Sequence, residues 1–121
     1  MFNSLIKSET QQIFLPVLEG KKVTLFIKRE DKIHPFVSGN KFRKLKYNIQ
    51  EAKKEKQKTL LTFGGAYSNH ILATAVAGNL AGLKTIGVIR GDELATDFEK
   101  TLASNSTLQQ AQENGMQFHC V

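Results

Sequence analysis

Residues 59–70 carry the sequence TLLTFGGAYSNH, and this stretch decides the fold. Its first five residues form a short apolar run closed by Gly64 and Gly65, a pattern typical of a buried parallel strand. Ser68 or Asn69 can then cap a helix by accepting a hydrogen bond from a backbone N–H. The stretch therefore predicts a strand that leads through a polar loop into a helix.

The helix after this loop is predicted to end at Gly82 and to pack closely on a sheet, because it is rich in alanine and contains Gly78. A helix over 40–56 precedes the strand, and Ser38 or Asn40 can cap it. The inward-facing residues expected are Phe42, Leu45, Ile49 and Ala52 in the first helix, and Ile71, Leu72, Ala75, Val76 and Leu80 in the second.

The same alternation continues to the end of the chain. Residues 85–89 predict a second buried strand, 92–104 fit no single element, and Asn105 or Ser106 caps a helix through Gln112 with Gly115 as its C-cap. A strand follows from Met116 to Val121. Helices that alternate with strands over short linkers predict an α/β fold, an open, mostly parallel twisted sheet with helices on its faces.

The N-terminal part differs. Ile13–Leu18 is apolar but broken by Pro16, so we expect an extended or turn segment that lies on a core. Val23–Lys28 alternates with period two and predicts a strand. Met1–Lys7 lacks the layout of a signal peptide, and no apolar run approaches the roughly 20 residues of a membrane span. We therefore expect a cytoplasmic protein.

Composition limits the function classes further. The chain has 121 residues, of which 40% are hydrophobic and 23% charged, as expected for one globular domain. A single cysteine, Cys120, excludes an internal disulfide and a cysteine-cluster metal site. His34 and His119 lack partners at metal-ligand spacing, so we predict no metal site and a structural or surface role for both. P-loop, GxGxxG, HExxH and GxSxG motifs are absent from the sequence.

The formal net charge is +6, and basic residues concentrate between 41 and 58. One interpretation is a surface for anions or nucleic acid, which would make the chain a non-catalytic α/β binding module. The other is a solvated helix face followed by a lysine-rich loop, which is the more common origin of such a pattern.

Two polar segments are candidates for a functional site. Ligands collect at the carboxyl ends of parallel strands, where the loop that contains Ser68, Asn69 and His70 lies; the helix start there favours a carboxylate or phosphate. Lys41 lies at another helix start, where the dipole disfavours a positive charge and so favours the neutral amine that a nucleophile requires. On spacing alone, Ser68 could simply be a cap and Lys41 one exposed lysine among many.

Three motifs in order carry a more specific signal: KRED at 28–31, GNKFRKL at 39–45 and GGAYSNH at 64–70. Together they resemble the 1-aminocyclopropane-1-carboxylate deaminase / D-cysteine desulfhydrase family. These are pyridoxal 5′-phosphate (PLP) enzymes of the tryptophan synthase β-subunit fold type, or fold type II. The resemblance covers about residues 20 to 121 and implies a lyase or deaminase that acts on a small amino acid and releases ammonia and a 2-oxo acid.

The resemblance also implies roles for individual residues. Lys41 matches the lysine that forms a Schiff base with PLP and moves the Cα proton, and Asn40, just before it, shapes the site. Asn69 matches the asparagine beside the cofactor ring. Ser68 matches the serine that meets the substrate carboxylate and assists catalysis. His70 matches a substrate-facing position that is glutamine in the deaminase branch and often histidine in desulfhydrases.

The resemblance further implies an arrangement of parts. Residues 1–36 would belong to the large PLP domain and 37–121 to the small α/β domain, while the C-terminal part that supplies the phosphate loop would be missing. We therefore expect an N-terminal fragment with half a site, inactive alone, from a protein that is a homodimer at full length; a family member that has lost this part and serves as a partner protein is the alternative. Tyr67 stands where the deaminase has glutamine, so the amino-acid substrate stays open.

Overall fold

The computed structural model describes residues 8–121, apart from the side chain of Asp92. The expectation drawn from Met1–Lys7 lies outside the described residues. In chain order the elements are β1 (Thr10–Ile13), η1 (Pro16–Leu18), β2 (Leu25–Lys28), η2 (Glu30–Lys32), α1 (Gly39–Lys54), β3 (Thr59–Gly65), α2 (Asn69–Ala81), β4 (Lys84–Arg90), α3 (Asp92–Ala95), α4 (Phe98–Ala103), α5 (Ser106–Glu113) and β5 (Met116–Cys120).

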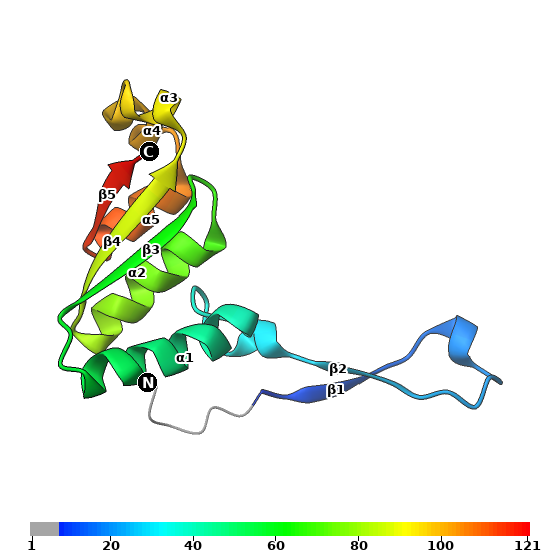
Figure 1. The fold of residues 1–121 in the computed structure, drawn as a ribbon. Coiled ribbons are helices and arrows are strands. Elements are labelled where there is room, and N and C mark those ends of the chain that lie inside the picture. The colour runs from blue at the N-terminus through cyan, green and yellow to red at the C-terminus, as the bar shows by residue number, and fades with distance from the viewer. Residues whose placement is uncertain (1–7) are drawn as a thin grey trace.

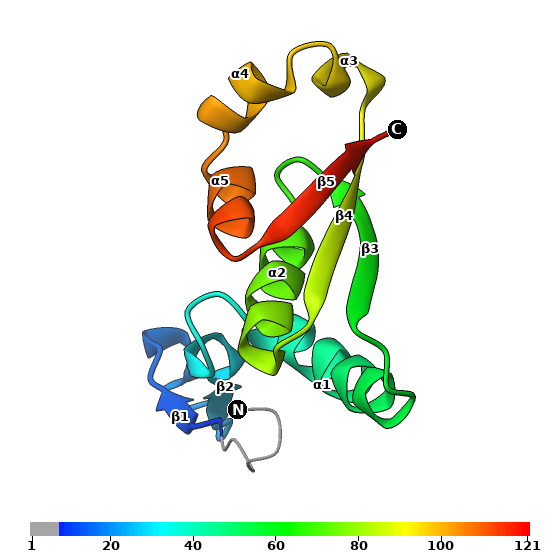
Figure 2. The same cartoon turned by 90° about the vertical axis from the view of Figure 1, so that its left-hand side faces the viewer.

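The predicted α/β fold is confirmed. Strands β3, β4 and β5 form a parallel sheet in that order, with Phe63 beside Val88 and Val88 beside His119. Figure 1 shows the three strands side by side, and Figure 2 shows α2 and α5 on the same side of them. The carboxyl end of β3 thus leads directly into α2, as residues 59–70 predict.

Helix α2 is buried on several sides, whereas a helix with a single apolar stripe would be buried on one side only. Its centre, residues 73–78, is buried throughout, since the helix lies between the sheet, α1 and α5. A Cβ at Gly78 would collide with Thr85 of β4, so this glycine permits the close approach to the sheet that the sequence predicts. Gly82 ends the helix at φ +71° as expected. The prediction for Leu80 was wrong, because this side chain is 54% exposed on the outer side of the helix.

Within residues 8–121, no helix covers the opposite face of the sheet (Figure 2). Leu61 and Phe63 of β3 are 56% and 70% exposed. The prediction of a strand buried on both faces was therefore wrong for residues 59–63, because both covering helices, α2 and α5, lie on one side (Figure 2). Only the alternate side chains Leu60 and Thr62 turn toward the helices, where they are half-buried.

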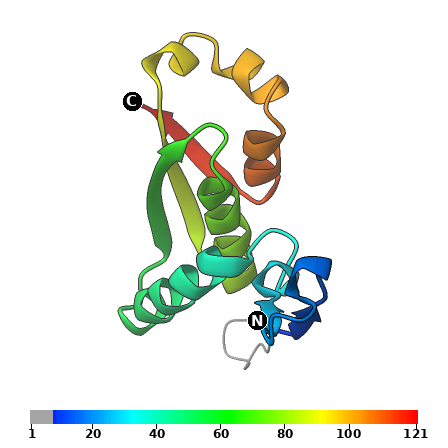
Figure 3. The same ribbon diagram turned by 90° about the vertical axis from the view of Figure 1, so that its right-hand side faces the viewer.

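Strands β1 and β2 form a separate antiparallel pair that projects from the α/β part (Figures 1 and 3). The predicted strand over 23–28 is confirmed from Leu25 onward, although its residues are exposed. The prediction that Ile13–Leu18 lies on a core was wrong: Phe14 and Val17 are 81% and 69% exposed, since the segment sits at the far end of this pair.

Helix α1 packs its predicted stripe of Phe42, Leu45, Ile49 and Ala52 into the interior, where three of these residues join Ala73, Val76 and Ala77 of α2. The lysines at its end are exposed, as both interpretations of the basic segment require.

The region left unassigned, 92–104, forms the short helices α3 and α4. Asn105 caps α5 as predicted, whereas the C-cap is Asn114 and Gly115 follows it at φ +82°. Within residues 8–121, no helix is long and apolar enough to cross a membrane.

Candidate active site

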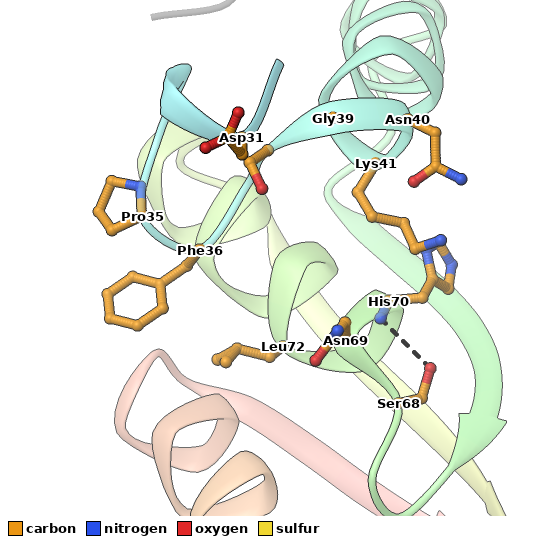
Figure 4. A pocket seen from close by; sticks show the side chains of 11 residues that line it. Asp31, Pro35, Phe36, Gly39, Asn40, Lys41, Ser68, Asn69, His70 and Leu72 are labelled. Carbon is orange, nitrogen blue, oxygen red and sulfur yellow. Dashed lines mark hydrogen bonds between the residues drawn. The ribbon is translucent and has the colours of Figure 1, made fainter. Parts of the chain in front are cut away.

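The starts of α1 and α2 face each other across a cavity of about 510 Å³. Figure 4 shows the side chain of Lys41 extending from the α1 side toward His70, with Ser68 and Asn69 on the α2 side. These two helix starts are the two segments that the sequence singled out, and they line one cavity although Lys41 and Asn69 lie 28 positions apart in the sequence. The cavity residues are Asp31, Pro35, Phe36, Ser38, Gly39, Asn40, Lys41, Ser68, Asn69, His70 and Leu72.

The start of α1 lacks a side-chain cap. Ser38 occupies the N-cap position in an extended conformation, but its hydroxyl accepts no hydrogen bond from the helix. Gly39 adopts φ +56°, a conformation that side chains disfavour, and it turns the chain into the helix. The backbone N–H of Lys41 donates to the Ser38 carbonyl at 3.2 Å. Asn40 is the second helical residue rather than a cap, and the predicted capping by Ser38 or Asn40 was wrong; both face the cavity instead.

An ion pair outside the cavity fixes α1 to the preceding η2 turn. Arg43 donates to both carboxylate oxygens of Glu30, at 2.8 and 3.0 Å, and the Ser8 hydroxyl donates to one of them at 2.6 Å. The hydrogen bonds from Arg43 and Ser8 lower the pKa of Glu30 to about 2. The neighbouring Asp31, which lines the cavity, is held by Arg29 at 2.6 Å.

His34 shapes the turn between η2 and α1. Its Nδ1 accepts hydrogen bonds from the backbone N–H groups of Phe36 and Val37, at 3.2 and 3.1 Å. Partial burial lowers the pKa of His34, which favours the neutral ring that these two bonds need. His34 therefore has the structural role that the sequence predicted, since it places Phe36 at the cavity wall.

The start of α2 is capped in the ordinary way. The Ser68 hydroxyl accepts a hydrogen bond from the His70 N–H at 3.2 Å, drawn as the dashed line in Figure 4. Asn69 is the first helical residue and its side chain is exposed toward the cavity. This helix start thus offers a hydroxyl, an amide and the end of a helix dipole to a ligand, a combination that suits an anion.

His70 is half-buried between the cavity and the sheet. Its Nε2 lies 2.8 Å from the Thr62 Oγ1 of β3. The pKa of His70 is lowered, first by burial and then by the positive charges of Lys41 and Lys44. The ring is therefore favoured in its neutral form at neutral pH.

The loop before α2 is held from inside the protein. The side chain of the buried Asn105 donates to the Ala66 carbonyl at 3.0 Å and accepts from the Leu108 N–H at 3.0 Å. A Cβ at Gly64 would lie 2.8 Å from Ile71, whereas Gly65 has open space around it. Neither glycine lines the cavity. Gly64 thus lets the loop fold back closely on α2.

The structure brings together all the candidate residues of the sequence: Asn40, Lys41, Ser68, Asn69 and His70. The contributions of Asp31, Pro35, Phe36 and Leu72 to the cavity were not predicted from the sequence, and neither was the contact of Thr62 with His70. The KRED motif at 28–31 was a partial signal for Asp31. No pattern in the sequence indicates that Thr62 reaches His70, because the contact depends on how α2 lies on β3.

The cavity fits one end of a cofactor such as PLP. It carries an amine for an aldehyde, hydrogen-bond donors, and a volume within the range of small-molecule sites, about 300–1,000 Å³. Among the residues that line it, Gly39 is the one glycine, so the described part of the wall contains no glycine-rich phosphate loop. In the same part of the chain, 8–121, no group of His, Cys, Asp and Glu side chains could hold a metal ion.

Comparison with known proteins supports the resemblance found in the sequence. The chain is 40% identical over 81 residues to the bifunctional D-cysteine desulfhydrase/1-aminocyclopropane-1-carboxylate deaminase, mitochondrial, of Arabidopsis thaliana; the matched segment covers 67% of this chain and 20% of that protein. It is 33% identical over 107 residues to the D-cysteine desulfhydrase of Klebsiella pneumoniae (strain 342), and here the matched segment covers 86% of this chain and 32% of that protein. No family model matches.

A solved structure agrees with these relatives. The crystal structure of an ACC deaminase homologue superimposes with a TM-score of 0.71 at 27% identity, over 98% of this chain and 34% of that one. The resemblance to this family and the predicted fold type are thereby confirmed, and PLP is the cofactor of the family. The chain spans between 20% and 34% of the length of these relatives.

Proposed function

We propose that this chain forms the lysine-bearing part of a PLP-dependent active site. Most of the chain is similar to a segment that makes up about a third of the length of a desulfhydrase and of a deaminase homologue. The full-length enzyme would act on a small amino acid of the D-cysteine or 1-aminocyclopropane-1-carboxylate type and release ammonia and a 2-oxo acid. The observation that carries the proposal is the shared cavity, in which Lys41 faces Ser68, Asn69 and His70.

Lys41 is the proposed cofactor lysine and proton carrier. PLP, when bound, supplies an electron sink that stabilises negative charge at the Cα of an amino acid. Lys41 is half-buried with its side chain in the cavity, so its amine can reach an aldehyde there and can hold or release a proton at Nζ. Asn40, one residue before it, lines the same wall and is positioned to contact the cofactor.

The start of α2 is the proposed substrate end. A carboxylate placed there would meet the Ser68 hydroxyl, the Asn69 amide and the helix dipole. The neutral ring of His70 adds a hydrogen-bonding group beside Lys41 (Figure 4) without adding a third positive charge next to Lys41 and Lys44. Ser68 lines the same cavity as Lys41, and we assign it a catalytic role with Lys41 as a helper in proton transfer.

We further propose a division of the chain between two domains. We assign the β1–β2 pair and the lead to residue 36 to the large domain, and 37–121 to the small domain, because the projecting pair is separate from the sheet (Figure 1). The cavity of this chain offers one wall of the site, so we expect the chain alone to have little or no turnover. The full-length enzyme is proposed to be a cytoplasmic homodimer.

Covalent mapping tests the proposal. The chain is mixed with PLP, reduced with borohydride, digested and analysed for the pyridoxyl adduct. We expect the adduct mainly on Lys41, and its loss in Lys41→Ala. Lys44→Ala is the matched control, since Lys44 lies on the same helix and is exposed, and it should leave labelling of Lys41 intact. An adduct spread over the lysines of 53–58, unchanged by Lys41→Ala, would contradict the proposal.

A further inference from the structure

The turn between η2 and α1 forms an apolar side of the main cavity. Pro35 and Phe36 line the cavity there, and Figure 4 shows both on the side away from Lys41. Neither side chain carries a hydrogen-bonding group, so this side suits the apolar part of a ligand whose polar groups face Lys41 and the α2 start. The position of these two residues therefore shapes the site.

His34 holds Phe36 through both its backbone and its ring. The Nδ1 atom of His34 accepts hydrogen bonds from the N–H groups of Phe36 and Val37, and the rings of His34 and Phe36 meet edge to face with centroids 6.3 Å apart. Within residues 8–121, neither N–H group has another acceptor. Val37 is anchored in the core, whereas Pro35 and Phe36 depend on His34 for their place at the cavity.

The two hydrogen bonds define the state of the His34 ring. A backbone N–H can only donate, so Nδ1 must offer its lone pair and the neutral ring carries its proton on Nε2. A protonated ring has a hydrogen on both nitrogens and can accept from neither N–H group. Protonation would thus leave both backbone groups without a partner, and the turn would have to open for water to reach them.

We propose that His34 is a positioning residue of the site: its neutral ring fixes Pro35 and Phe36 as an apolar wall, and its protonated ring releases them. The inference rests on the proposed function, since the wall would act on the ligand that Lys41 holds. A released wall no longer supports the apolar part of that ligand, so the affinity for the ligand falls as the ring gains its proton.

The charges around the turn leave this role to His34 itself. Partial burial lowers the pKa of His34, and no neighbouring charge in residues 8–121 contributes to the shift. The charged side chains of the adjoining elements interact elsewhere: on η2 Asp31 with Arg29 and Lys32 with Glu9, and on α1 Arg43 with Glu30, and Lys41 and Lys44 with His70. The ring is therefore neutral at neutral pH and gains its proton below its ordinary pKa of 6.5.

NMR of the full chain without cofactor, from about pH 8 to about pH 5, tests the role of the ring. At the higher pH we expect a proton on Nε2 of His34 and none on Nδ1, and the amide signals of Phe36 and Val37 should move as His34 titrates. His34→Asn keeps an acceptor for the two N–H groups and should hold these signals in place at every pH. His34→Phe keeps a ring without an acceptor and should show the acid pattern throughout. His119→Asn is the matched control, because His119 is exposed on β5, and it should leave the titration unchanged.

The affinity for PLP is then compared between the parent chain and His34→Asn at each pH. Both proteins contain Lys41 and His70, so the titration of these groups and of PLP cancels in the ratio of the two affinities. A site that is competent in only a fraction of the molecules loses affinity in proportion. The parent should therefore bind PLP about twofold more weakly than His34→Asn at the midpoint of the His34 titration, and about tenfold more weakly when about nine-tenths of the ring is protonated.

A proton on Nδ1 at the higher pH would overturn the inference, and so would amide signals of Phe36 and Val37 that titrate equally in His34→Asn. A ratio of affinities that stays at one while His34 becomes protonated would also overturn it, because the wall would then have no effect on the ligand. If PLP fails to label Lys41 in both proteins at every pH, the proposed function fails, and the ring and amide signals still decide whether His34 fixes the wall. The same amide spectra report whether each variant is folded.

Discussion

The two helix starts that face the cavity begin with the same residue type but are built differently. Ser68 caps α2 with its hydroxyl, and Asn105 holds the loop before it from inside the protein. Ser38 stands at the equivalent position of α1 and makes no cap bond; there the chain turns at Gly39, and the Glu30–Arg43 pair fastens the helix from the surface. The start that would bind the substrate is rigidly supported, while the start that bears Lys41 leaves its polar groups to the cavity.

Removing the internal support of the α2 start should have the largest effect. Asn105→Ala removes the cap of α5 and leaves the buried Ala66 carbonyl without its partner, which together should cost about 2–4 kcal/mol of unfolding free energy. Asn105→Ser keeps a cap but cannot reach Ala66, so it should lose about half as much. Chemical denaturation measures both. Equal losses in the two variants would show that the bond to Ala66 contributes nothing.

Gly39 should have the next largest effect, on the other helix start. Gly39→Ala meets no neighbouring atom within 4 Å, but φ +56° disfavours a side chain, so we expect a loss of about 1–2 kcal/mol. Gly65→Ala is the control, because Gly65 has equally open space without a positive φ and should lose less. The unfolding curves of the two variants measure these losses of stability. If Gly39→Ala left the stability unchanged, the turn into α1 would not be fixed as described.

The two serines compare the helix starts most directly. Ser68→Ala removes a side-chain cap and should cost about 1 kcal/mol, whereas Ser38→Ala removes none and should change stability by less than about 0.5 kcal/mol. Thermal or urea unfolding of the two variants gives the ratio. If Ser38→Ala were the more destabilising of the two, the contrast between the helix starts would be wrong.

Acid should weaken the fold slightly through His70, the smallest effect we expect. Because burial and the charges of Lys41 and Lys44 lower the pKa of His70 in the folded protein, the unfolded chain binds a proton at higher pH. The contribution of His70 is therefore present above its ordinary pKa of 6.5 and is lost as the pH falls through its folded value. His70→Gln should reduce the pH dependence of the urea midpoint below pH 6.5. Part of that dependence should remain in this variant, because the pKa of His34 is also lowered in the folded protein.

The sequence predicted the parts of the fold that depend on local pattern. The apolar stripe of α1, the caps at Ser68 and Asn105, and the left-handed Gly82 all follow from spacing or residue type, and the structure has them. The exposure of Leu61 and Phe63 could not be predicted, since it depends on which side of the sheet the helices take, and that of Leu80 depends on which elements surround α2. The exposure of β2 could not be predicted either, because the alternation of Val23–Lys28 indicates a strand but not which residues cover it.

The candidate site was predictable in its residues but not in its geometry. Lys41 and Ser68–His70 came from their positions at helix starts and from the family resemblance, and the structure places them on one cavity. The bond between Thr62 and His70, and the support of Ala66 by Asn105, join residues on different elements. Such contacts arise from the packing of α2 and α5 against β3, which no local pattern encodes.

A titration of the ¹⁵N-labelled chain with PLP tests the central claim most directly, that two helix starts form one site. The backbone amide signals of 39–41 and 68–70 should shift together and saturate at the same PLP concentration, and Lys41→Ala should weaken the shifts of both groups. Shifts confined to one helix start, or to the exposed lysines of 53–58, would contradict the claim.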